Sequence, residues 1–92
     1  MIEVPEFLQD ECWNTLALEY GEQIPVNLTR ILAVIDKRIW GDEITHAKRL
    51  MQDSRSRGCY DMKDMQTVAQ ILWNWRGYMK ADFATELLWR MP

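Results

Sequence analysis

The stretch NLTRILAVIDKRIWG, residues 27–41, carries the clearest structural signal in the chain. Its apolar side chains recur at three- and four-residue steps, as they do along one face of an α-helix; they are Leu28, Ile31, Leu32, Ile35 and Ile39. Asn27 is a residue type that caps helix N-termini, and Gly41 is one that ends helices. The spacing therefore predicts an amphipathic helix that begins after Asn27 and ends at Gly41.

The segments on either side show the same helical spacing. Pro5 can occupy a first helical turn, because its missing N–H would have no partner there, and Gly21 is a natural stop. We therefore expect a helix between these two residues. Asp42 is placed to cap a third helix, which we expect to fray out by Gly58.

A fourth helix is expected to begin at Asp61. If residues 61–91 formed one helix, it would be about 45 Å long and would overhang a compact domain of this chain length. We therefore expect a break between Gly77 and Asp82, with Asp82 capping a last helix. No segment alternates apolar and polar residues between turn signals, as a strand would.

These elements predict one domain, residues 1–92, with an all-α fold: a compact bundle of four to five short helices and no sheet. The apolar share of 48% and the charged share of 27% are typical of a folded globular chain. The predicted core takes residues from one face of each helix: Leu16, Ile31, Ile35, Leu50, Val68, Leu72 and Trp75.

The net charge of −3 is unevenly distributed along the chain. Residues 1–29 contain six acidic residues and no Lys or Arg, whereas residues 47–92 contain eight basic and five acidic residues. Such an asymmetry is able to orient a partner or a second copy of the chain.

The sequence favours a cytoplasmic protein. The N-terminal segment is acidic and lacks the positive region of a secretory signal, and no apolar run approaches the length of a membrane span. Cys12 and Cys59 are far apart and form no metal-binding motif, so we expect reduced thiols.

Residue types that carry catalysis are sparse. His46 is the only histidine, and local spacing pairs it with Asp42 but with no Ser or Cys nucleophile. Asp61 and Asp64 fall in a first helical turn, where the helix dipole favours acids. The four glycines are dispersed, so they form no phosphate-binding loop. We therefore expect no enzyme, no metal site and no cofactor.

Residues 71–91 hold three of the five tryptophans. Trp75 belongs to the apolar stripe of the fourth helix, whereas Trp73 lies roughly 140° around the axis from the centre of that stripe. Trp73 therefore either packs beneath the last helix or stands at a surface.

The sequence favours a small non-enzymatic regulator, adaptor or inhibitor that binds a protein partner through this C-terminal region. Trp, Tyr and Arg dominate the energetics of protein interfaces, and the expected anchors are Trp73, Arg76, Tyr78 and Trp89. In size, acidity and tryptophan content the chain resembles phage-encoded proteins that block host machinery, although no motif carries this likeness.

Two alternatives remain open. A basic segment suggests a nucleic-acid-binding module, and its residues are Lys48, Arg49, Arg55, Arg57 and Lys63. Against this, Asp42 and Glu43 stand where a recognition helix would meet DNA, and the isoelectric point is near 5.0. The second alternative is an obligate homo-oligomer, such as a homodimer, in which Trp73 and Trp89 are buried between copies.

Overall fold

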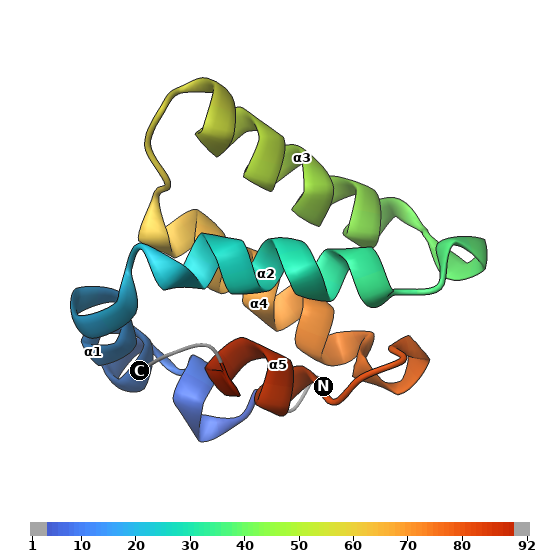
Figure 1. Ribbon diagram of the computed structural model, residues 1–92, viewed down its shortest axis with the longest axis horizontal. Coiled ribbons are helices and arrows are strands. Elements are labelled where there is room, and N and C mark those ends of the chain that lie inside the picture. The colour runs from blue at the N-terminus through green and yellow to red at the C-terminus, as the bar shows by residue number, and fades with distance from the viewer. Residues whose placement is uncertain (1–3, 90–92) are drawn as a thin grey trace.

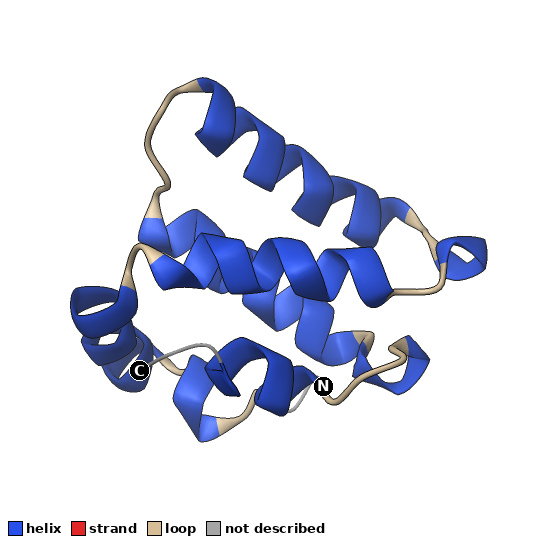
Figure 2. Ribbon diagram, in the orientation of Figure 1, coloured by secondary structure: helices blue, strands red, loops and turns tan. Residues whose placement is uncertain are grey.

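The computed structural model describes residues 4–89, which form five α-helices joined by turns (Figures 1 and 2). The helices are α1 (Asp10–Tyr20), α2 (Gln23–Val34), α3 (Asp42–Ser56), α4 (Met62–Asn74) and α5 (Phe83–Trp89). Short 3₁₀ turns are η1 (Glu6–Leu8), η2 (Lys37–Ile39) and η3 (Arg76–Tyr78). Within residues 4–89 there is no strand, and Ile35 and Met79 form one isolated antiparallel bridge. The predicted all-α bundle is confirmed.

Helix α2 lies in the middle of the bundle and crosses in front of α4 (Figure 1). Helix α3 packs along α4 on one side of α2, and α5 packs against α2 on the other side. Helix α1 lies at one end, and η1 packs against both α1 and α4. The extents of 34 × 29 × 26 Å leave every helix close to a common centre.

The core draws on all five helices, and its largest buried side chains include Trp13, Ile24, Leu28, Ile44, Met65 and Phe83. Four residues of the predicted core are buried: Ile31, Ile35, Val68 and Leu72. Leu16, Leu50 and Trp75 were expected to join them, but they are half-buried and pack on the rim of the core. In α1 it is Trp13 that turns inward, and Trp75 lies beyond the last residue of α4.

The prediction that Asn27 caps α2 is wrong. The helix begins four residues earlier at Gln23, and Pro25 lies in its first turn, where no N–H partner is lost. Asn27 is buried inside the helix, where its amide donates to the carbonyl oxygen of Leu87 at 2.6 Å. A polar residue that resembles a cap in the sequence therefore holds α5 against α2.

The prediction that this helix continues to Gly41 is also wrong. Helix α2 ends at Val34, because Ile35 is extended (φ −73°, ψ 136°). Asp36 then accepts hydrogen bonds from the guanidinium and the backbone N–H of Arg38, and these bonds lower the pKa of Asp36 to about 2. An Asp that binds the backbone two residues onward favours a turn over a helix, and Ile39 consequently lies in η2.

Two other helix starts differ from the prediction. The helix expected from Pro5 is broken at Gln9, whose backbone is extended (φ −76°, ψ 155°), so that η1 and α1 are separate elements. Asp42 is the first residue of α3 rather than its cap, and Gly41 holds the cap position without a side-chain bond. At its other end α3 runs to Ser56, and the chain reverses at Gly58 with φ at +72°.

The predicted break before the last helix is confirmed. Helix α4 ends at Asn74, the chain turns through η3, and Asp82 accepts a hydrogen bond from the N–H of Thr85 at 2.8 Å at the start of α5. This backbone hydrogen bond lowers the pKa of Asp82. The chain leaves the helical path two residues before Gly77, because Trp75 already has non-helical angles (φ −98°, ψ 11°).

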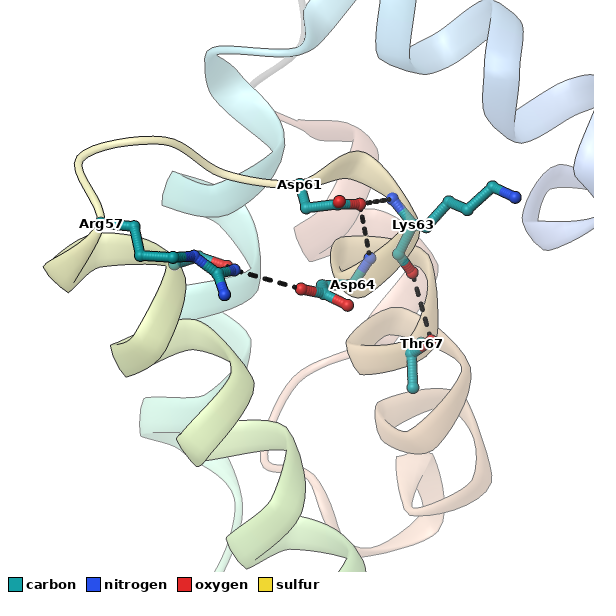
Figure 3. Close-up of polar contacts among 6 residues, drawn as sticks. Arg57, Asp61, Lys63, Asp64 and Thr67 are labelled. Carbon is teal, nitrogen blue, oxygen red and sulfur yellow. Dashed lines mark hydrogen bonds and ion pairs between the residues drawn. The ribbon is translucent and has the colours of Figure 1, made fainter.

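The fourth helix was predicted to begin at Asp61; α4 begins one residue later, and Asp61 is its N-cap. This cap gives a first testable effect. Its carboxylate accepts hydrogen bonds from the N–H groups of Lys63 at 2.8 Å and Asp64 at 3.3 Å (Figure 3). Asp61→Ala is expected to lower the free energy of unfolding by about 1 kcal/mol, since such caps typically contribute that much. Thermal unfolding followed by circular dichroism measures the loss. Asp53→Ala, an exposed change within α3, is the control, and an equal loss in both variants would contradict the capping role.

Candidate protein-binding surface

Tyr78, an exposed aromatic residue of the C-terminal region, lies on a short turn after α4. We call residues 75–78 the aromatic turn. Its backbone is closed by two hydrogen bonds, from the N–H of Tyr78 to the carbonyl oxygen of Trp75 at 3.0 Å and from the N–H of Met79 to that of Arg76 at 3.2 Å. The turn therefore has a defined shape.

The aromatic turn is fixed to two other elements. The Trp75 indole N–H donates to the carboxylate of Glu43 in α3 at 2.9 Å. Directly after the turn, Met79 pairs with Ile35, and the N–H of Lys80 donates to the carbonyl oxygen of Val34 at 3.4 Å. These contacts hold the turn against the end of α2 and the start of α3.

Two of the predicted anchors point outward from this fixed turn. Tyr78 is 56% exposed, and its ring lies 5.5 Å from the half-buried ring of Trp75. Arg76 is exposed, and its guanidinium carbon lies 4.0 Å from the centre of the Trp73 ring. The guanidinium also donates to the carbonyl oxygen of Trp73 at 2.8 Å. The turn thus presents an exposed aromatic ring, held against Trp75, and a cation that is positioned over Trp73.

Trp73 packs beneath the last helix, which is one of the two positions expected for it. Its ring makes edge contacts with Phe83 at the start of α5, at 5.8 Å between centres, and with Phe7 in η1 at 6.0 Å. Trp73 is half-buried, and much of its surface is used by the fold. Trp89 ends α5, and its side chain lies outside the described residues.

The five residues of the basic segment are all exposed, but they do not share one face. Arg57 approaches Asp64 at 3.5 Å, whereas Lys63 extends away on the other side of α4 (Figure 3). Lys48 lies over the ring of Trp40, 4.5 Å from its centre. Only Lys48 and Arg55 line a common feature, a groove between α2 and α3.

The residues considered for chemistry are not brought together. His46 and Asp42 are both exposed on α3. Within the described part of the chain, no three His, Cys, Asp or Glu side chains gather as a metal ion would require. No helix among residues 4–89 is long and apolar enough to cross a membrane.

Sequence reasoning missed two surface features. One is the groove between α2 and α3, of about 370 Å³. The other is a wider hollow of about 1240 Å³, bounded by the end of α1, the start of α2 and residues 58–62. Their lining residues come from separate elements, so no local spacing marks them. Leu18, which borders the hollow, is 89% exposed.

Comparison with known proteins assigns no relative to this chain: no family model, curated protein or solved structure matches it. A functional inference therefore depends on the surface itself.

Proposed function

We propose that this chain is a small non-enzymatic protein-binding regulator, adaptor or inhibitor that docks through the aromatic turn. The observation that carries the proposal is Tyr78, which is 56% exposed on a backbone fixed by α2 and α3. Large aromatic side chains bury much of their surface on average, so an exposed ring on a fixed backbone, in a turn that also carries an arginine, is typical of an interface anchor.

The fixed backbone of the aromatic turn also favours the binding of a partner. A side chain that is already positioned loses less conformational entropy when a partner binds, which leaves more of the interaction energy as affinity. The ring contact with Trp75 and the indole bond to Glu43 supply this positioning for Tyr78.

The charges around the turn favour a protein partner over a polyphosphate. Arg76 and Lys80 are accompanied by the carboxylate of Glu43, so both signs are present. A nucleic-acid surface requires a continuous basic face, whereas the basic segment is divided between the middle of α3, its C-terminal end and the outer side of α4.

Tyr78→Ala tests the proposal. The variant is expected to fold, because the lost ring is more than half exposed, and its partner affinity is expected to fall about tenfold or more, as for a hot-spot residue. The measurement compares the proteins that the immobilised chain and the variant retain from an extract of the native cells, followed by titration of the retained protein.

Leu88→Ala is the matched control, since Leu88 is another exposed apolar residue, at 40% exposure, on α5. It is expected to retain the same partner as the unaltered chain. Equal retention by the Tyr78→Ala variant would contradict the proposed docking site. Retention of nucleic acid that is lost at high salt would instead favour the alternative module.

A further inference from the structure

The groove between α2 and α3 is basic and apolar at once. Lys37, Lys48 and Arg55 line it, and its apolar lining includes Leu32 and Met51. No acidic side chain is among the described residues that line it. In a chain with a net charge of −3, three cations around an apolar floor indicate an occupant that is acidic and carries an apolar side chain.

The spacing of the groove suits a helix. Lys48 and Arg55 are seven residues apart on the same face of α3, which places them about 10 Å apart along the axis, with Met51 between them. Nearby, the buried indole N–H of Trp40, another lining residue, has no acceptor within the described part of the chain. Lys48, Met51 and Arg55 thus recur along the groove at the spacing of helical turns, which is also the spacing of side chains on a helix that would lie in the groove.

Helix α1 carries the complementary pattern on its outer face. Leu18 is 89% exposed, and Glu11, Thr15 and Glu22 share its face at steps of three and four residues. Glu22 lies in the turn after α1, where Gly21 and Glu22 have helical backbone angles, and it borders the same hollow as Leu18. This face, an apolar residue between two carboxylates, is complementary to the apolar floor and the cations of the groove.

The two features lie next to each other on the molecule. Leu18 borders the hollow beside α1, and that hollow shares Thr29 and Tyr60 with the groove. A two-fold axis is therefore able to bring α1 of each copy to the groove of the other, so that every contact is made twice.

From these observations we infer that two copies of this chain associate about a two-fold axis, with α1 of each copy lying in the α2–α3 groove of its partner. Leu18 covers the apolar floor, and Glu11 and Glu22 face the cations of the groove. This surface shares no residue with the aromatic turn. The inference is therefore independent of the proposed function, and each can be tested without the other.

Light scattering behind a sizing column, over a wide concentration series, tests the dimer. The unaltered chain is expected to approach twice its mass of 11.0 kDa as its concentration rises, and to dissociate as salt is added. Leu18→Gln, and separately the double change Lys48→Gln with Arg55→Gln, are each expected to raise the dissociation constant about tenfold or more. Leu18, Lys48 and Arg55 are all exposed, so the variants should keep the thermal unfolding profile of the unaltered chain.

Arg49→Gln is the matched control, because Arg49 is an exposed cation beside Lys48 that does not line the groove. Its dissociation constant is expected to stay that of the unaltered chain. A chain that remains monomeric at every concentration would overturn the inference, as would an equal effect of Arg49→Gln.

Mixing the two defective variants separates this arrangement from other dimers. A heterodimer of the Leu18→Gln chain and the Lys48→Gln, Arg55→Gln chain keeps one intact contact, since the first retains its groove and the second its α1 face. The mixture is therefore expected to form a dimer at concentrations where each variant alone is monomeric. A mixture that stays monomeric would show that Leu18 and the groove do not meet.

Discussion

Trp13→Ala is expected to lower the free energy of unfolding by about 3–5 kcal/mol, a large part of the stability of a domain of this size. Trp13 is the largest buried side chain, with 1% of its surface exposed. Its indole N–H also donates to the carbonyl oxygen of Met62 at 2.8 Å. The substitution therefore removes core volume and the hydrogen bond that joins α1 to the start of α4.

Urea denaturation followed by circular dichroism measures this loss. Asn14→Ala is the matched control, since Asn14 is the exposed neighbour of Trp13 on α1, and a change within about 0.5 kcal/mol is expected for it. Trp13→Phe should fall between the two, because it keeps an aromatic ring but loses the indole bond. Equal stability of the Ala variants at positions 13 and 14 would contradict the placement of α1.

Phe83→Ala is expected to release α5 and to cost about 3 kcal/mol or more. Phe83 is 2% exposed and stacks on Phe7, and its ring meets that of Trp73 at 5.8 Å. Helix α5 has seven residues, too few to hold a helix without tertiary contacts. The buried side chain of Leu87 and the hydrogen bond from Asn27 to the Leu87 carbonyl oxygen would then have to keep α5 in place.

Hydrogen exchange of the α5 amides, measured together with urea denaturation, tests this effect. The amides of α5 are expected to exchange much faster in the Phe83→Ala variant while those of α3 stay protected. Leu88→Ala, which alters an exposed position of the same helix, should leave both unchanged. Unaltered protection of α5 in the Phe83→Ala variant would show that Phe83 does not anchor it.

Local signals predicted much of this fold. Apolar residues at helical spacing located the helices. The helix start near Asp61 and the cap at Asp82 were visible because a capping bond joins residues two or three positions apart. The end of α2 was missed, since a stripe that continues through Ile35 and Ile39 concealed the turn that Asp36 forms with Arg38.

Asn27 shows where local reasoning fails. Its residue type fits a cap, but its partner is the carbonyl oxygen of Leu87, sixty positions away in the chain. No pattern within one segment contains that information, because the bond exists only once α5 has packed on α2.

The candidate site was predictable in part for the same reason. The composition of the C-terminal region drew attention to Arg76 and Tyr78, and both are exposed in the structure. The sequence left open whether Trp73 is covered, since that depends on Phe7 and Phe83, which come from the two ends of the chain. The groove between α2 and α3 was missed because Leu32 of its apolar floor belongs to α2, whereas Lys48 and Arg55 belong to α3.

The most direct test of the proposed function is photo-crosslinking from position 78. A photoreactive phenylalanine analogue replaces Tyr78 in one sample and Thr67, an exposed residue on α4, in another, and each chain is irradiated in its native cells. Docking through the aromatic turn predicts an adduct with a specific protein from position 78 and none from position 67. Absence of any adduct at position 78, or adducts only with a second copy of the chain, would contradict the binding of a protein partner there.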